Sequence, residues 1–469
     1  MSLNDNYRSP LENRYASKEL RAIWSPQRKF STWRRLWLAL AEAQRELGLD
    51  ISQAQIDQLA AHLDDIDYES AARHEALLHH DVMAHIHALG EVAPDARSVI
   101  HLGATSQFVN CNTELILIRE SLELIARRLA TAIDALGTFA VEHRDLPTLG
   151  FTHFQPAQPT TVGKRATLWA CDLAIALEDI EHRLDMLRFR GVKGATGTQA
   201  SFLALFDGDR EKVERLDELV AEKMGWRADR RFIVTGQTYP RLVDAQVLGS
   251  LAVAAAAAHK CATDIRLLAH CKEIEEPLEN SQVGSSAMPY KRNPMLCERA
   301  SGLARFVMSL AANGLSTAST QWLERTLDDS SNRRLTLPES FLALDGALDA
   351  LGRVVGGLVL YPRVIRAHLM DELPFLVTED ILMAATKQGA DRQEAHEVIR
   401  GHSRDVARRV KVEGLSNDLL DRLRAEPMFN GVDFDALMDP AGRIGVAPEQ
   451  VDRFIAAVVE PIRARYGGS

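Results

Sequence analysis

The stretch VLGSLAVAAAAAHK, residues 247–260, is apolar on nearly every side and rich in alanine. It lies within a proline-free segment that runs from Arg241 to Cys271. A segment that is apolar all round is typical of a helix packed on every side by other helices. A helix over the whole segment would be about 45 Å long at 1.5 Å per residue. The stretch therefore predicts a protein built around long, buried helices.

Three further segments keep apolar residues at helical spacing over similar lengths. They cover residues 112–145, 161–190 and 294 to about 313. The sequence shows no fixed repeat period and no sustained alternation of apolar and polar residues. A helix bundle is therefore favoured over a repeat protein or a sheet. We expect an all-α fold with a central bundle of long helices.

The chain is long enough for several domains, because its 469 residues exceed the size at which one core keeps growing. Loop-rich breaks occur at HLGATSQFVNCN, DLPTLGFTHFQPAQPTT and GLVLYPRV. They predict a helical N-terminal domain over 1–111, a long-helix domain over 112–361 and a C-terminal helical domain over 362–469. The small side chains of 241–271 would let neighbouring helices approach closely, either within one chain or between subunits.

The composition limits the kinds of partner. Apolar residues make up 46% of the chain and charged residues 26%, an ordinary balance for a globular protein. The formal net charge of −10 argues against nucleic acid as the main partner, because neutralising phosphates needs a basic surface. A small anionic substrate would need only a local group of cations, so it stays open.

The cysteines and the N-terminus bear on the compartment. The five cysteines are scattered and form no C-x-x-C pair, which suits a reducing cytosol better than a disulfide framework or a zinc site. The N-terminus is polar and shows no signal-peptide pattern. The alanine-rich uncharged run, residues 245–258, has 14 residues, too few to span a membrane. We expect a soluble, cytoplasmic protein.

The loop GSSAMPYKRNP, residues 284–294, combines a glycine, two serines and two cations between prolines. Asn293 and Pro294 have the residue types of an N-cap and a first helical position. Free N–H groups at that helix start, beside Lys291 and Arg292, would form an anion site. The alternative is a mobile surface loop followed by a well-capped helix.

A second loop, GFTHFQPAQPTT, places Thr152 and His153 between long helices. A histidine there could serve as a general acid or base near neutral pH. A lone loop histidine is more often structural.

The run HHDVMAHIH, residues 79–87, suggests a metal site at first sight. Helical metal ligands stand at i and i+4, and in this run that spacing joins only Asp81 to His85. His80, His85 and His87 are spaced by five and two, so they do not share a helix face. Hydrogen bonding to a bound anion, or simple solvation, is the favoured interpretation.

The segment QWLERTLDDSSNRR places Arg325, Ser330 and Arg334 across a polar helix break. Two guanidinium groups and a hydroxyl would suit a phosphate or a carboxylate. Ion pairs with the acidic residues of the same segment are an equally good explanation. The sequence contains no Walker motif, dinucleotide fingerprint or G-x-S-x-G elbow.

Taken together, these segments resemble the fumarase/aspartase superfamily, whose members release fumarate by β-elimination. In the longer forms GSSAMPYKRNPMLCERA and QWLERTLDDSSNRR, with HLGATS, GFTHFQPAQPTTVGKR and KGATGTQASF, they are similar to the adenylosuccinate lyase family. The likeness runs in order from about Asn13 to near the C-terminus. Five collinear motifs make a chance match a poor explanation.

The resemblance implies an all-helical, three-domain subunit that forms a homotetramer with active sites shared between subunits. It implies two substrates, adenylosuccinate, which gives AMP and fumarate, and the carboxamide ribotide SAICAR, which gives AICAR and fumarate. It implies no cofactor and no metal.

The resemblance also implies roles for individual residues. Ser285 matches the general base that removes the Cβ proton, and His153 matches the general acid, with Thr152 beside it. Lys291 and Asn293 would hold the carboxylate that gains charge, and Glu298 would orient the histidine or the loop. Opposite protonation states of acid and base imply a bell-shaped pH profile. The substrate-binding set carried over from the family consists of Arg14, Tyr15, His79, His80, Asp81, Thr105, Ser106, Thr152, Gln237, Asn293, Arg299, Arg325, Ser330 and Arg334.

His79 departs from the family pattern, in which arginine usually precedes the His-Asp pair. A neutral imidazole has one donor where a guanidinium has five. We therefore expect phosphate binding to rely more on Arg14, Arg325 and Arg334. Replacing His79 with arginine should then change substrate affinity near neutral pH.

Three alternatives are open at this level. Argininosuccinate lyase, fumarase or aspartase activity would fit the loop, although the arginines and the PYKRNP form favour a nucleotide substrate. A structural protein that kept the fold and lost the activity is disfavoured by intact Ser285, His153 and Lys291. A helical scaffold is disfavoured because the sequence has no period.

Overall fold

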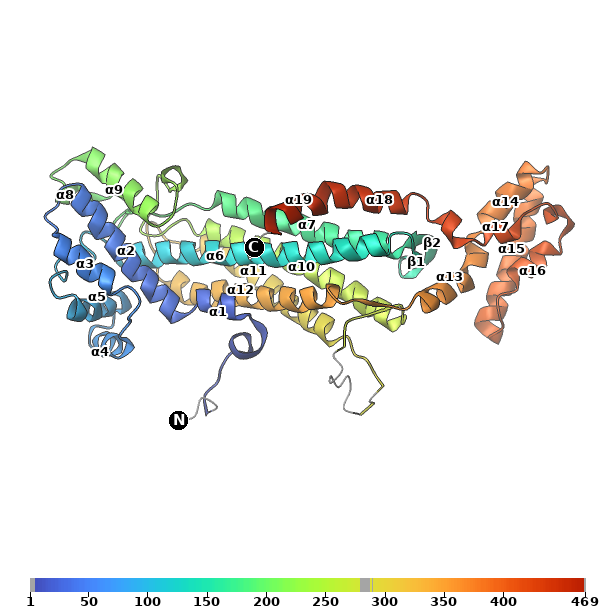
Figure 1. Ribbon diagram of the computed structural model, residues 1–469, viewed down its shortest axis with the longest axis horizontal. Coiled ribbons are helices and arrows are strands. Elements are labelled where there is room, and N and C mark those ends of the chain that lie inside the picture. Colours follow the sequence, from blue (N-terminus) through green and yellow to red (C-terminus); the bar gives the residue numbers. More distant parts are fainter. Residues whose placement is uncertain (1–4, 279–286, 289, 468–469) are drawn as a thin grey trace. The chain divides into compact units, whose positions relative to one another are not determined.

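The computed structural model describes residues 5–278, 287–288 and 290–467. These residues form two compact units, each assembled from separate parts of the chain. Unit 1 comprises 1–129, 175–259 and 299–350, and unit 2 comprises 130–174, 260–298 and 351–469. Nearly all elements are helices, so the all-α prediction is confirmed (Figure 1). The division into three domains stays a prediction.

Unit 1 holds nine helices of the described residues entirely and parts of the long helices. The first is the turn η2 (Leu11–Tyr15), and the others are α1 (Lys18–Ile23), α2 (Pro26–Glu46), α3 (Gln53–Ala61), α4 (Tyr68–Leu78), α5 (Asp81–Val92), α8 (Ala200–Leu205), α9 (Arg210–Lys223) and η3 (Ala228–Arg230). Helix α2 packs against α3 and α9 (Figure 1).

The helix starts of unit 1 follow local sequence signals. Ser25 accepts the backbone N–H of Arg28 before Pro26 opens α2, as an N-cap followed by proline should. Ser52 and Gln55 form a reciprocal capping box at α3. These helices begin where the sequence supplies side-chain acceptors for the first free N–H groups.

Five long helices have residues in both units. They are α6 (Ser106–Glu142), α7 (Val162–Met186), α10 (Leu242–His270), α11 (Met295–Ser319) and α12 (Asp328–Val355). The predicted segment 241–271 matches α10 to within one residue at each end. Among the described residues, α10 alone is long and apolar enough to cross a membrane, but 56% of its most apolar window is buried in the structure. That burial is typical of a core helix.

Two short antiparallel strand pairs were not predicted. Strand β1 (Pro147–Thr152) pairs with β2 (Gln155–Thr161), and β3 (Ile274–Glu275) pairs with β4 (Val359–Leu360). The sequence does not predict β2 because this strand contains Pro156 and Pro159. Proline is confined to the edge strands and bulges of β-sheets. The register shifts between Leu149 and Phe151, where a side chain on Gly150 would meet the Gln158 carbonyl oxygen at 2.5 Å.

The C-terminal helices of unit 2 have their own apolar core. Helix α13 packs on β1 and on α14, and α14 packs on α15 (Figure 1). Leu373, Ile381, Ala395, Leu419 and Phe429 lie in this core. These helices are α13 (Pro362–Leu376), α14 (Thr378–Lys387), α15 (Arg392–Arg408), η4 (Arg409–Glu413), α16 (Leu419–Arg424), η5 (Pro427–Phe429), α17 (Phe434–Leu437), η6 (Pro440–Arg443), α18 (Ala447–Phe454), η7 (Ile455–Val459) and α19 (Glu460–Tyr466).

All five cysteines are free thiols. Cys111 of unit 1 is buried, and so are Cys261 and Cys297 of unit 2. Burial raises the pKa of both Cys261 and Cys297 above the ordinary range of a thiol. These three side chains serve as small core residues.

Gly163 of α7 tests how closely the helices of unit 2 approach. A Cβ atom there would lie 2.3 Å from the Ala140 carbonyl oxygen and 2.6 Å from Arg144 Cα, both backbone atoms. We expect Gly163→Ala to lower the free energy of unfolding by about 1–3 kcal/mol, measured by urea denaturation. Gly401 of α15 has no atom within 4 Å of its position for Cβ. Gly401→Ala should instead add about 0.5–1 kcal/mol, and equal effects of the two changes would contradict the crowding.

Candidate active site

Four of the predicted residues meet at the start of α5 in unit 1. His80 is the N-cap of α5, and its Nδ1 accepts the backbone N–H of Met83 at 3.3 Å. Nε2 of the same ring lies 3.2 Å from Ser106 Oγ. Because Nδ1 accepts, the neutral ring carries its proton on Nε2, which donates to Ser106. The Asp81 carboxylate accepts a hydrogen bond from Arg334 at 3.2 Å, so residues far apart in sequence form one polar surface.

His79 and Thr105 adjoin this group in the sequence. His79 ends α4 in the left-handed conformation with φ 49°, and its side chain is exposed. Its part in phosphate binding stays a prediction. Thr105 precedes α6, where its carbonyl accepts the N–H of Phe108 at 2.7 Å.

The remaining histidines of the run 79–87 do not face a common point. His85 is buried and stacks on Phe30 with ring centres 3.8 Å apart. Burial first, and then Arg34 and Lys29, lower the pKa of His85 to about 4. His87 stacks on His74 at 5.1 Å. The expectation of anion contact or solvation is therefore wrong for His85, which is a neutral core residue.

Arg325 and Gln237 lie around the turn that precedes α12. Arg325 donates to Asp329 at 3.4 Å, and the buried Arg241 donates to the same carboxylate at 2.7 Å. The backbone N–H of Gln237 donates to the Glu324 carbonyl at 3.0 Å. Ser330 and Arg334 then follow one turn apart on α12. The ion pair of Arg325 is therefore partly buried and holds the turn.

A buried network supports this end of α12. Arg333 donates to Asp244 at 2.6 Å and to Glu114 at 2.8 Å, and it also contacts Tyr239. Burial alone would raise the pKa of Glu114, but Arg333 and Arg241 together hold it below its ordinary value. The carboxylate is therefore charged and paired.

Arg14, Tyr15 and Arg299 form a third group in unit 1. The guanidinium carbons of Arg14 and Arg299 lie 5.9 and 5.7 Å from the centre of the Tyr15 ring. The Tyr15 carbonyl oxygen would be 2.9 Å from a Cβ atom on Gly346 of α12. Glycine at that position lets η2 lie directly against the helix.

Thr152 and His153 lie at the tip of the β1–β2 hairpin in unit 2. His153 and Phe154 have φ of 54° and 56° and form the two-residue turn. Positive φ at both positions defines a type I′ turn, which normally selects asparagine and glycine. A histidine held there is strained and exposed, a combination found at functional sites.

The start of α11 differs from the expectation. The helix begins at Met295, and the backbone N–H groups of Leu296 and Cys297 donate to the Glu276 carboxylate at 3.0–3.1 and 3.0 Å. Asn293 is therefore not its N-cap, and Glu276 already occupies the predicted anion site. Arg292 pairs with Glu275 at 3.2 Å, while Lys291 is exposed. Gly284 and Ser285 lie outside the described residues, and the roles of Lys291, Asn293 and Glu298 stay predictions.

Known protein families and relatives match most of this chain. Residues 14–309 match the lyase family, and residues 374–454 match the adenylosuccinate lyase C-terminus. The adenylosuccinate lyase of Saccharomyces cerevisiae is 52% identical over 456 residues, which cover 96% of this chain and 94% of the relative. That of Schistosoma mansoni is 47% identical, with 98% and 97% covered. The chain belongs to the adenylosuccinate lyase family. It is therefore a lyase.

Solved structures agree with this fold. A fumarate lyase from Mesorhizobium sp. BNC1 superposes with a TM-score of 0.80 at 25% identity, covering 96% of this chain and all of the other. The 3-carboxy-cis,cis-muconate lactonizing enzyme from Pseudomonas putida superposes with a TM-score of 0.82 at 23% identity, covering 98% and 99%. The helical architecture of this chain is thus shared with a fumarate lyase and with a lactonizing enzyme.

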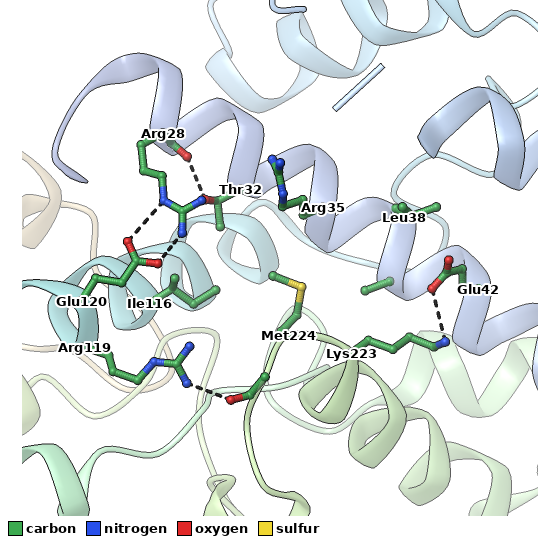
Figure 2. Close-up of a pocket in the computed structure, with 12 residues that line it drawn as sticks. Arg28, Thr32, Arg35, Leu38, Glu42, Ile116, Arg119, Glu120, Lys223 and Met224 are labelled. Atoms are coloured by element: carbon green, nitrogen blue, oxygen red, sulfur yellow. Dashed lines mark hydrogen bonds and ion pairs between the residues drawn. The ribbon is translucent and has the colours of Figure 1, made fainter. Parts of the chain in front are cut away.

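A groove in unit 1 is lined by charged side chains of α2, α6 and α9. It has a volume of about 390 Å³ and lies between α2, α6 and the end of α9 (Figure 2). Arg28 pairs with Glu120 and Lys223 pairs with Glu42 (Figure 2). Arg35 pairs with Asp64 at 2.9 Å, outside the groove. These three cations each have a carboxylate partner, and the fourth cation of the groove, Arg119, donates to the Gly225 carbonyl at 2.9 Å.

Sequence reasoning did not single out several groups that the structure places beside the site. Lys29 of α2 lines the same cavity as Arg334. His101 accepts a hydrogen bond at Nδ1 from Trp37 at 2.8 Å, with φ of 67°. Glu114 and Arg333 belong to the buried network. A charged residue on an apolar helix face was the signal available for Glu114 and Lys29.

Acid should destabilise the protein through His85. The unfolded side chain takes up a proton near pH 6.5, whereas the folded one resists until about pH 4. The stability it contributes is complete above pH 6.5 and is lost as the pH falls towards 4. Between pH 7 and 5 this amounts to about 2 kcal/mol. Between pH 7 and 5, the free energy of unfolding of His85→Phe, measured by urea denaturation, should therefore fall by about 2 kcal/mol less than that of the natural protein. The exposed variant His79→Phe is the control, and the same pH dependence for all three proteins would refute the assignment.

Proposed function

We propose that this enzyme cleaves adenylosuccinate to AMP and fumarate, and SAICAR to AICAR and fumarate. The observation that carries the proposal is 47–52% identity to adenylosuccinate lyases over nearly the whole chain. The exposed cation Arg334, placed beside His80, Asp81 and Ser106, supports it because both substrates carry a phosphate. The five free thiols support a place in the cytoplasm.

In the proposed mechanism, Ser285 removes a proton from Cβ of the succinyl group. The electron pair left on Cβ is delocalised into the adjoining carboxylate, which gains charge. This electron pair then forms the C=C double bond of fumarate as the C–N bond breaks. His153 gives its proton to the departing nitrogen, so that the products are fumarate and an amine. Lys291 and Asn293 stabilise the charged intermediate, as preorganised donors do elsewhere, and Thr152 adjoins the acid.

Binding of the nucleotide falls to the groups of unit 1. Arg325, Ser330 and Arg334 offer two guanidinium groups and a hydroxyl at the start of α12, a pattern that suits a phosphate. Tyr15 between Arg14 and Arg299 offers a ring and two cations. The remaining members of the proposed binding set are His79, His80, Asp81, Thr105, Ser106 and Gln237.

We also propose a homotetramer with shared active sites. Large apolar side chains are exposed next to Arg325: Trp322 is 75% exposed, Leu323 97% and Leu327 72%. Such a patch favours burial against another protein surface. Its position beside a substrate-binding residue supports a subunit contact at the site.

The proposal is tested by ultraviolet absorbance assays on adenylosuccinate, SAICAR and argininosuccinate. The natural protein should cleave the first two, and Ser285→Ala should lower kcat by at least about 10³-fold because no base remains. The kcat/KM profile should be bell-shaped with pH. Activity on argininosuccinate alone would move the protein to that branch, and full activity of Ser285→Ala would remove Ser285 as the base.

The subunit contact is tested by placing a charge in the apolar patch. Leu323→Glu should shift the mass measured by light scattering from tetramer towards smaller species, because burying an unpaired carboxylate is costly. Its specific activity should fall in parallel. Leu77 of α4 is also exposed, at 79%, and Leu77→Glu serves as the control. A tetramer that persists in Leu323→Glu would place the interface elsewhere.

A further inference from the structure

Lys29 is a partly buried cation on α2 that has no ion pair with a carboxylate among the described residues. Its Nζ lies 4.9 Å from the centre of the Trp33 ring and 5.2 Å from that of Phe30. In the part of the chain that the structure describes, no hydrogen bond or ion pair joins Nζ to a carboxylate. Burial lowers the pKa of Lys29, which is the effect of withdrawing an ammonium group from water.

The other cations in this part of α2 are all paired. Arg28 contacts Glu120, Arg34 contacts Asp65 at 2.9 Å, and Arg35 contacts Asp64 at 2.9 Å. A partly desolvated charge is costly unless something neutralises it. The contrast therefore indicates that the partner of Lys29 is not among the residues that the structure describes.

Lys29 lines a cavity of about 180 Å³ together with groups from α6 and α12. Two of these groups are already engaged, since Arg333 binds Glu114 at 2.8 Å. Thr113 is 1% exposed, and its hydroxyl has no hydrogen-bond partner among the described residues. Arg334 lines the same cavity and is 62% exposed at its side chain. Three cations thus line the cavity, of which Arg333 and Arg334 contact carboxylates, together with a hydroxyl that has no partner among the described residues.

The nearby charges favour a dianion as the missing partner. Asp81, Glu114 and Glu75 act on Lys29 favourably and Arg334 unfavourably. Two of these carboxylates are already hydrogen-bonded to other cations, Asp81 to Arg334 and Glu114 to Arg333. Among the described residues, none of the three has a hydrogen bond or ion pair with Lys29 Nζ. A phosphate monoester carries between one and two negative charges and three acceptor oxygens. A carboxylate brings one charge and only two oxygens, so it satisfies the group less well.

We propose that Lys29 is a further substrate-binding residue, whose ammonium group receives the phosphate of the substrate together with Arg334. This inference rests on the proposed function, which supplies a substrate with a phosphate. Lysine binds phosphate as a compact point charge on a flexible stem. Lys29 thus supplies a cation in the same cavity as Arg334.

The test removes the cation and the phosphate in turn. The variants are Lys29→Met and Lys29→Arg, and the substrates are adenylosuccinate and succinyladenosine, which lacks the phosphate. Lys29→Met should lower kcat/KM on adenylosuccinate about 10- to 100-fold, mainly through KM, as expected for a lost charged contact. On succinyladenosine it should stay within about twofold of the natural enzyme. Lys29→Arg should recover most of the loss.

Lys212→Met is the matched control, because Lys212 also lies over a ring, 5.9 Å from the centre of Phe206. It should leave both substrates unaffected. An equal loss on both substrates in Lys29→Met would mean a structural role, and no loss would mean no contact; either result overturns the inference. If the natural enzyme cleaves neither substrate, the proposed function fails. Calorimetric titration with inorganic phosphate then decides Lys29 alone, and equal affinity of Lys29→Met and the natural protein would reject it.

Discussion

The buried contacts of Arg333 and Arg241 fix the arrangement on which the candidate site depends. Arg333 joins Asp244 of α10 to Glu114 of α6, and Arg241 holds Asp329 of α12. Such charges are stable inside a protein only as complete sets, since removing one partner leaves the other uncompensated. The three helices are therefore held in a single register within unit 1.

In this arrangement, the adjacent residues Arg333 and Arg334 have different roles: the first is buried and paired, and the second faces outward. Arg333 is 5% exposed at its side chain and is saturated by its partners, whereas Arg334 is 62% exposed and has one carboxylate contact. Consecutive residues on a helix point about 100° apart, so a well-anchored residue can present its neighbour outward. The rigidity of the first arginine gives the second a defined position without occupying its donors. Preorganisation of this kind lowers the cost of ordering a ligand.

Much of the fold could be predicted because it depends on local patterns. The apolar periodicity located α10 to within one residue at each end. In the structure, His80 and Asp81 lie beside Ser106 and Arg334, and their part in substrate binding stays a prediction. The β1–β2 hairpin could not be predicted, because its prolines argue against a strand. Glu276 as the acceptor at the start of α11 is a contact made 20 residues away. Lys29 could not be singled out, because it stands among three arginines of α2 in the sequence and the cavity that sets it apart is formed by residues of α6 and α12.

The three buried thiols can be used to detect local unfolding of the protein. A thiol reagent attacks the thiolate from solution, and burial holds Cys261 and Cys297 in the neutral form, out of its reach. Labelling therefore requires that the surrounding structure opens, and its rate follows the free energy of that opening. Cys111 reports on unit 1, while Cys261 and Cys297 report on unit 2. The order in which these thiols become labelled would rank the two units by their resistance to local unfolding.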